Sequence, residues 1–199
     1  MTSDVDIIRN LLPQGYADQI EQDLLRPQFP WFLIDDVTSS VSQESRPGLT
    51  NIVYDYRQAP TEWYAFVKPM IYQIEQATQQ KIVNLLRIRV GLLLPNVTAT
   101  CLQNAPHVDF NMPHKTACYY VNDSDGDTVV FSNTVHDISA KEISDVTVDE
   151  YVQTASFAEL GRCAPVKNTL CVFDGARFHA STYPKVTAKR IVITINYQV

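Results

Sequence analysis

Apolar and polar residues alternate with a period of two along RIVITINYQV, residues 190–199. In an extended strand this period separates a mixed, partly polar face from a uniformly apolar face. The mixed face consists of Arg190, Val192, Thr194 and Asn196, and the apolar face consists of Ile191, Ile193, Ile195 and Tyr197. The apolar face predicts packing against helices, so the Arg190 face is expected to point into the interior of a β structure.

Four further segments have the length and the β-branched and aromatic content of strands. They are KIVNLLRIRVGLLL, KTACYYVN, DTVVF and NTLCVF, which begin at residues 81, 115, 127 and 168. The sequence NDSDGD, residues 122–127, is a strong turn signal between two of them. Within KTACYYVN, Tyr120 shares a face with Thr116 and Cys118, so Tyr120 faces inward if Tyr119 faces the helices.

Two segments before residue 81 have the pattern of amphipathic helices. In PQGYADQIEQDLLRP, residues 13–27, apolar residues recur every four positions between two prolines. The second segment is PTEWYAFVKPMIYQIEQATQQ, residues 60–80, and Pro69 inside it should kink or split the helix. Residues 139–161 are acidic and weakly helical, and we interpret them as an insertion among the strands or a lid.

Helices followed by a long series of strands predict an α+β fold that is mainly β, a sandwich or barrel with helices on one face. The length of 199 residues fits one domain with a full core. We therefore expect a single domain over residues 1–199. Residues 1–80 would supply helical support, and residues 81–199 would form the β core.

Charge and cysteine content narrow the class of protein. The formal net charge of -6 argues against a nonspecific binder of the nucleic-acid backbone, so nucleic acid is not an expected partner. The four cysteines form no CxxC pair, which favours buried free thiols. The chain starts with acidic residues where a signal peptide would be basic, and no apolar run reaches membrane-spanning length. We expect a cytoplasmic protein without a membrane segment.

The sequence NAPHVDFNMPH, residues 104–114, places His107 and Asp109 two positions apart. On an extended segment the two side chains point to the same side, at a spacing that suits two ligands of one metal ion. The candidates for a third ligand are His114, His136 and His179. Two histidines and one carboxylate on a β scaffold form the facial triad of non-haem iron(II) oxygenases.

Arg190 supports this interpretation. It opens the last strand eleven residues after His179, and it lies on the face that is expected to point inward. A buried guanidinium needs an anionic partner, because an unpaired buried charge is costly. A dicarboxylate cosubstrate would supply that partner, since a planar carboxylate matches the arginine fork.

From about residue 85 to its end, the chain resembles the prolyl-4-hydroxylase-like branch of the 2-oxoglutarate- and Fe(II)-dependent dioxygenases. The segments that carry the resemblance are HVDFNMPHKTACYYVNDSDGDTVVF, NTLCVFDGARFHAS and KRIVITINY. They follow the family order of an HxD motif, a tyrosine-bearing strand, an acidic turn, and a distal histidine with its arginine. The resemblance implies a double-stranded β-helix, or jelly roll, over residues 81–199.

The resemblance also assigns roles to individual residues. His107, Asp109 and His179 match the iron ligands, and Arg190 matches the residue that pairs with the far carboxylate of 2-oxoglutarate. Tyr120 matches a position that supports the same carboxylate, and Thr194 matches a smaller polar neighbour. The implied cofactors are Fe(II) and 2-oxoglutarate, with ascorbate as an additional candidate. The implied reaction consumes dioxygen, hydroxylates an unactivated C–H bond and releases succinate and CO2.

Alternatives remain open from the sequence. One is a non-catalytic jelly-roll binding protein that retains the metal site. Another is a zinc metallohydrolase built on His107, Asp109 and either His114 or His136, which would leave Arg190 without a role. The substrate is a small molecule or a peptide, and a prolyl residue is one candidate. Arg87 and Arg89 share one face of their strand, which is either solvent-exposed or lines a pocket for an acidic substrate.

Overall fold

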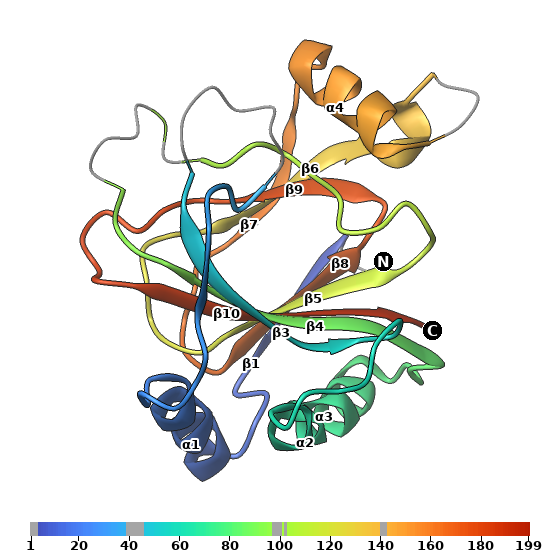
Figure 1. The fold of residues 1–199 in the computed structure, drawn as a ribbon. Helices are drawn as coiled ribbons and strands as arrows, with labels where there is room; N and C mark the ends of the chain where they lie inside the picture. Colours follow the sequence, from blue (N-terminus) through green and yellow to red (C-terminus); the bar gives the residue numbers. More distant parts are fainter. Residues whose placement is uncertain (1–3, 39–45, 97–100, 102, 140–142) are drawn as a thin grey trace.

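A computed structural model describes residues 4–38, 46–96, 101, 103–139 and 143–199 (Figure 1). The helices in this part of the chain are α1 (Gln14–Leu24), α2 (Tyr64–Val67), α3 (Pro69–Thr78), α4 (Asp145–Thr154) and the 3-10 helix η1 (Val135–Asp137). The strands are β1 (Val5–Arg9), β2 (Phe32–Ile34), β3 (Gly48–Asp55), β4 (Asn84–Leu93), β5 (Lys115–Tyr120), β6 (Thr128–Thr134), β7 (Glu159–Cys163), β8 (Thr169–Asp174), β9 (Arg177–Ser181) and β10 (Arg190–Gln198).

The larger sheet has seven strands in the order β1-β8-β5-β10-β4-β3-β2, and all of its pairs are antiparallel. β10 lies at its centre, between β4 and β5. Ile193 is opposite Val90 of β4 and Tyr119 of β5, so the apolar side chains of three strands meet on one face. The five strands predicted from the sequence as 81–94, 115–122, 127–131, 168–173 and 190–199 all form, with slightly different ends.

The smaller sheet has the order β7-β6-β9 and lies over the open face of the larger sheet (Figure 1). Residues 103–107 extend it on the far side of β9 through isolated bridges between Gln103 and Thr182 and between His107 and His179. The two sheets therefore enclose an interior between them. This arrangement, with antiparallel sheets and few helices, confirms the predicted jelly-roll fold.

Helices α1, α2 and α3 cover the outer face of the larger sheet (Figure 1). The apolar face of β10 packs there, as its alternation predicts, against Ile20 and Leu24 of α1 and Met70 and Ile74 of α3. Pro69 separates α2 from α3, which confirms the predicted split, because proline lacks the N–H that a continuous helix requires. The helices therefore stabilise the sheet from the side opposite to the interior.

The division of the chain at residue 80 is wrong in one respect: residues 1–80 supply more than helical support. β1, β2 and β3 lie before residue 81; β1 and β2 form the two edges of the larger sheet, and β3 lies next to β2. β1 and β2 have no buried residue on either face, so they lack the alternation of a half-buried strand. Backbone pairing with β8 and β3 makes these segments strands, and in β1 the side chains of Val5 and Ile8 also pack against the core.

The segment interpreted as an insertion or lid contains α4 and most of β7, and its residues 140–142 lie outside the described part. α4 packs through Val148, Tyr151 and Val152 against the outer face of the smaller sheet, where Phe131 and Phe178 are buried. This position is on the side of the sheet away from the interior (Figure 1). The described part of the segment therefore forms an insertion that covers the smaller sheet.

The turn 122–127 joins β5 of the larger sheet to β6 of the smaller sheet, so it connects the two sheets rather than forming a hairpin. The Asp125 carboxylate accepts hydrogen bonds from the backbone N–H groups of residues 185, 186 and 187, at 2.9 to 3.0 Å. The Asn122 side chain accepts a hydrogen bond from Ile191 N–H at 2.8 Å. These contacts fix the start of β10, and with it the backbone at Arg190.

The sequence predicted buried free cysteines and no membrane segment. Cys118, Cys163 and Cys171 are buried, as predicted, whereas Cys101 is exposed. Among the described residues, no helix is long and apolar enough to span a bilayer.

Asn168 connects the N-terminal segment to the centre of the fold. It is buried with a positive φ of 61°, a conformation that asparagine tolerates better than most residues. Its side chain accepts a hydrogen bond from Leu12 N–H at 2.9 Å and donates one to Leu12 O at 2.8 Å. Its own N–H donates to Tyr120 O at 2.9 Å. Asn168 thus fastens the entry to α1 onto the ends of β5 and β8.

We predict that Asn168→Ala lowers the free energy of unfolding by about 3 kcal/mol or more, because it leaves buried groups of Leu12 unpaired and puts alanine in the left-handed region. Asn168→Gly removes the same hydrogen bonds but fits the backbone, so its loss should be smaller by about 1 kcal/mol. Urea denaturation measures both. Values within about 0.5 kcal/mol of the unchanged protein for both variants contradict this role of Asn168.

Candidate active site

His107, Asp109 and His179 come together in the interior between the two sheets. One potential ligand atom from each lies within 4.8 Å of the other two. The backbones of His107 and His179 exchange two hydrogen bonds, each 2.9 Å long, which hold the residues opposite one another. Asp109 follows in a bend rather than in a regular strand. Of the candidates for a third ligand, His179 belongs to this group, whereas His114 and His136 do not.

The two histidines are oriented for metal binding through Nε2. Nδ1 of His107 lies 3.2 Å from Ala105 O, so a neutral ring carries its proton there and leaves Nε2 as the acceptor. Nε2 of His179 points toward Asp109 Oδ2 at 3.7 Å. Burial lowers the pKa of His107, and burial together with the neighbouring His107 lowers the pKa of His179 to about 3. Both imidazoles are therefore neutral at physiological pH, the form that binds metals.

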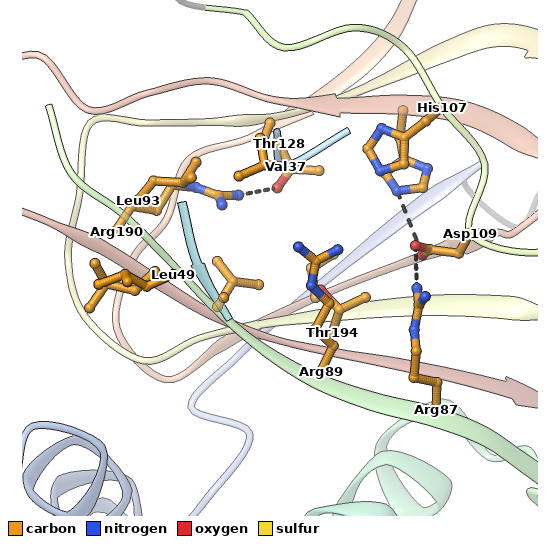
Figure 2. A pocket seen from close by; sticks show the side chains of 16 residues that line it. Val37, Leu49, Arg87, Arg89, Leu93, His107, Asp109, Thr128, Arg190 and Thr194 are labelled. Carbon is orange, nitrogen blue, oxygen red and sulfur yellow. Dashed lines mark hydrogen bonds and ion pairs between the residues drawn. The ribbon is translucent and has the colours of Figure 1, made fainter. Parts of the chain in front are cut away.

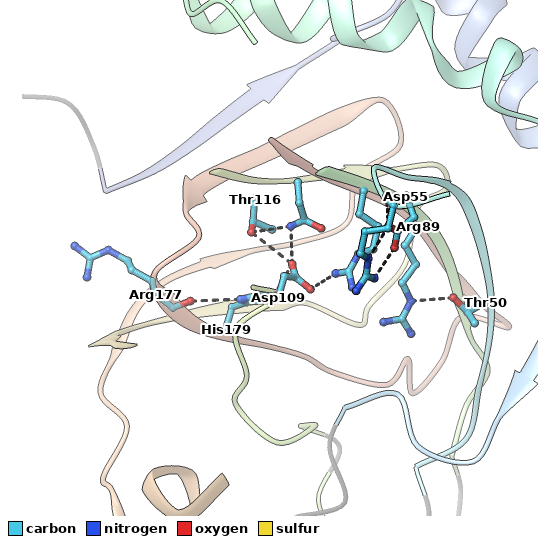
Figure 3. Close-up of polar contacts among 10 residues, drawn as sticks. Thr50, Asp55, Arg89, Asp109, Thr116, Arg177 and His179 are labelled. Carbon is cyan, nitrogen blue, oxygen red and sulfur yellow. Dashed lines mark hydrogen bonds and ion pairs between the residues drawn. The ribbon is translucent and has the colours of Figure 1, made fainter. Parts of the chain in front are cut away.

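The Asp109 carboxylate is held by three side chains (Figure 3). Oδ1 accepts a hydrogen bond from Arg87 Nη2 at 2.5 Å, and Oδ2 accepts one from Asn196 Nδ2 at 2.8 Å and a longer one from the Thr116 hydroxyl at 3.4 Å. Burial would raise the pKa of this carboxyl, but the Arg87 guanidinium and the other neighbours outweigh burial and hold the pKa well below its usual range. The Asp109 carboxylate is therefore ionised and held in one orientation.

Arg190 faces the interior, as the alternation of β10 predicts, and is only 6% exposed. Its Nε donates to Gly126 O at 2.5 Å and its Nη2 donates to the Thr128 hydroxyl at 2.8 Å. A Cβ added at Gly126 would lie 2.6 Å from Thr182 O and 3.0 Å from Arg190 Cδ, so only glycine leaves room for this contact. The guanidinium is therefore fixed in one orientation at one end of a pocket (Figure 2).

The same pocket reaches from Arg190 to the His–Asp–His group. It is lined by residues of both sheets, which include His107, Asp109, Thr128, His179, Ser181, Arg190, Val192 and Thr194. Thr194 of β10 is among these lining residues. Tyr120 faces inward but is not among the lining side chains. The Arg190 guanidinium lies over the Tyr120 ring, 5.8 Å from its centre, so Tyr120 contacts the arginine through a cation–π interaction.

Arg87 and Arg89 also line this pocket, so their shared face of β4 is the interior rather than solvent. Sequence reasoning left this choice open and did not identify Arg87, Thr116 or Asn196 as partners of Asp109. The sequence could have indicated that Asn196 points into the interior, because Asn196 shares a face of β10 with Arg190. For Arg87 the sequence shows only that its side chain is on the same face of β4 as Arg89, and it does not show which face of β4 the second sheet covers.

The fold was compared with known proteins. No protein-family model and no curated protein sequence matches the chain. Among solved structures, a prolyl-4-hydroxylase from Pseudomonas putida is 13% identical, with a TM-score of 0.56 and coverage of 99% of this chain and 93% of that one. An oxidoreductase of the 2OG-Fe(II) oxygenase family from Burkholderia pseudomallei is 10% identical, with a TM-score of 0.63 and coverage of 98% and 85%.

A third solved structure is the epimerase SnoN in complex with Fe3+, alpha ketoglutarate and nogalamycin RO. It is 13% identical, with a TM-score of 0.62, and the match covers 98% of this chain and 79% of that one. At identities this low the similarity establishes the fold and not the reaction. The chain has the fold shared by the 2-oxoglutarate- and Fe(II)-dependent oxygenases, prolyl 4-hydroxylases among them.

Proposed function

We propose that this protein is a 2-oxoglutarate- and Fe(II)-dependent oxygenase that hydroxylates an unactivated C–H bond, with release of succinate and CO2. The observation that carries the proposal is that a His–Asp–His group and the buried Arg190 line one pocket. A metal site alone would suit many reactions. A metal site with a fixed guanidinium in the same pocket suits a ligand with two anionic ends.

The donor set fits Fe(II). Two neutral imidazoles and one carboxylate on a β scaffold are the ligands of non-haem iron(II) oxygenases, which keep further coordination positions open. His107, Asp109 and His179 would hold the ion, and Arg87 and Asn196 would keep the carboxylate in place. When bound, the iron supplies the activation of dioxygen and the oxidation of the substrate.

The remaining pocket residues would position 2-oxoglutarate. The Arg190 guanidinium would bind the far carboxylate, because Gly126 and Thr128 already fix its orientation before any ligand arrives. Thr194 would contact the same molecule from β10, and the Tyr120 ring would help to hold the arginine. A preoriented guanidinium binds a carboxylate through two parallel hydrogen bonds, which also sets the direction of the ligand.

Two other functions can be weighed against this proposal. A zinc hydrolase built on His114 or His136 disagrees with the geometry, because the third member of the group is His179. A non-catalytic binding protein would have the same site but would not turn over 2-oxoglutarate. The deciding experiment measures succinate release with Fe(II), 2-oxoglutarate, dioxygen and a panel of peptides, prolyl peptides included, amino acids and other small molecules. No succinate with any member of the panel favours the binding protein.

We predict that His107→Ala and His179→Ala each weaken Fe(II) binding by more than about a hundredfold, since even the loss of a group that only supports a ligand costs 10–100-fold. Anaerobic isothermal titration calorimetry with Fe(II) measures the affinity. The control is His136→Ala, which changes an exposed histidine in η1 and should leave Fe(II) affinity unchanged. A comparable loss in the control, or none in the two site variants, places the metal elsewhere.

We predict that Arg190→Met weakens 2-oxoglutarate binding about a hundredfold, which corresponds to about 3 kcal/mol for a buried carboxylate without its cation. Arg190→Lys should recover part of this loss, because an ammonium supplies the charge without the planar fork. The measurement is a 2-oxoglutarate titration followed by the charge-transfer absorbance of the anaerobic Fe(II) protein.

Fe(II) affinity in both Arg190 variants should stay within about twofold of the unchanged protein, because Arg190 contacts none of the three metal-binding side chains. The matched control is Arg26→Met, which removes an exposed arginine of the segment after α1 that pairs with Asp23. Unchanged 2-oxoglutarate affinity in Arg190→Met would show that the arginine serves another ligand.

A further inference from the structure

The pocket carries more positive charge than iron and 2-oxoglutarate require. Its lining contains three arginines, Arg87, Arg89 and Arg190, and one carboxylate, Asp109. A divalent ion would add two positive charges, and the dianion of 2-oxoglutarate would remove two. The lining arginines therefore still exceed the carboxylate by two charges when both are bound. This excess is unexpected in a chain whose net charge is -6.

Two of the three arginines already have a role. Arg87 forms an ion pair with Asp109, and both side chains are mostly buried, at 16% and 7% exposure. Arg190 is held by Gly126 O and the Thr128 hydroxyl and is the arginine proposed to bind 2-oxoglutarate. Arg89 has neither role. Within the part of the chain that the structure describes, it forms no ion pair with a carboxylate, and the proposed function assigns it no ligand.

Arg89 extends from β4 into the pocket, between Arg190 and Asp109 (Figure 2). Its Nε donates to the Thr50 hydroxyl at 2.8 Å, which fixes the direction of the side chain (Figure 3). Among the described residues, none accepts a hydrogen bond from the two terminal amino groups of the guanidinium, which leaves them for a ligand. Burial and the neighbouring Arg87 lower the pKa of Arg89, while Asp109 opposes them. A cation in this setting gains from an anionic partner more than one in water does.

The pocket has room beside Arg89. The alternation of β4 puts Gly91 on the same face, and a Cβ added at Gly91 would meet no heavy atom within 4 Å. Leu49, Leu93 and Val192 line the pocket around this space. A ligand here would meet an oriented guanidinium at one point and apolar side chains around it, which suits a molecule with one carboxylate on an apolar body.

We propose that the substrate of this protein carries a carboxylate and that Arg89 binds it, next to the metal group and apart from Arg190. This inference rests on the proposed oxygenase function and narrows its substrate class to organic acids, either free or as an acidic side chain of a peptide. Arg87 does not take this role, because its guanidinium neutralises Asp109. Arg89 would therefore select the substrate and orient it toward the metal group.

The test uses matched pairs of an acid and its neutral amide. The small-molecule pair is N-acetylproline and N-acetylprolinamide, and the peptide pair differs by one glutamate or glutamine. Binding of each compound is measured by isothermal titration calorimetry to the protein loaded with Mn(II), which replaces Fe(II) without turnover, and with saturating 2-oxoglutarate. The variants are Arg89→Met, Arg89→Lys and the control Arg26→Met.

In the unchanged protein we expect at least one acid to bind tenfold or more tightly than its amide. Arg89→Met should weaken that acid about tenfold or more and leave the amide unchanged, so the preference disappears. Arg89→Lys should restore part of the preference, because the charge returns without the fork. Arg26→Met should behave like the unchanged protein. A preference in the N-acetylproline pair indicates a free organic acid as substrate, and a preference in the peptide pair indicates an acidic side chain of a peptide.

Two results overturn the inference. The first is no preference for the acid in either pair, absence of binding included. The second is weaker binding of 2-oxoglutarate itself in Arg89→Met, titrated without any acid or amide, which would assign Arg89 to the cosubstrate. Failure of the proposed oxygenase function looks different, because the unchanged protein would then not bind 2-oxoglutarate in the anaerobic Fe(II) titration.

Discussion

The two faces of β10 constrain the whole molecule. This strand lies at the centre of the larger sheet, and both of its faces are covered, one by the helices and the other by the smaller sheet (Figure 1). Ile193 and its apolar neighbours pack against α1 and α3, whereas Arg190, Thr194 and Asn196 face the interior. A strand places successive side chains on opposite faces, so a shift of one residue would put the arginine under the helices. The position of β10 in the sheet therefore determines both the packing of the helices and the residues of the site.

Buried charge is the second determinant of the site, and the structure balances most of it. Asp109 is buried, but Arg87, Asn196 and Thr116 each contribute a contact. These contacts come from β4, β10 and β5, so the carboxylate also ties three neighbouring strands together. Since a buried carboxylate without such partners would take up a proton, the contacts favour an ionised carboxylate. The same burial keeps the histidine rings neutral, and both effects prepare the group for a cation.

The connection between the sheets brings distant residues together. His107 and His179 are 72 positions apart, yet their backbones pair directly. Arg190 depends in the same way on the turn that joins β5 to β6, because Gly126 and Thr128 orient its guanidinium. The site is thus built from short stretches of both sheets. No single segment contains the combination of metal group and arginine, which explains why the fold can vary the pocket while its core stays intact.

The sequence by itself determined helices α1, α2 and α3, five of the strands, the break at Pro69 and the facing of Arg190. These features depend on local periodicity, which a sequence displays directly. The spacing in the sequence also predicted His107 and Asp109 as a pair of metal ligands, whereas the third candidate, His179, came from the family resemblance, since His114 and His136 are equally plausible from residue type. Tertiary structure alone decided the edge strands β1 and β2 and the pocket position of Arg89. Each of these features depends on backbone pairing or on which face of a strand the second sheet covers. Backbone pairing and sheet coverage produce no periodic pattern of apolar residues in the sequence.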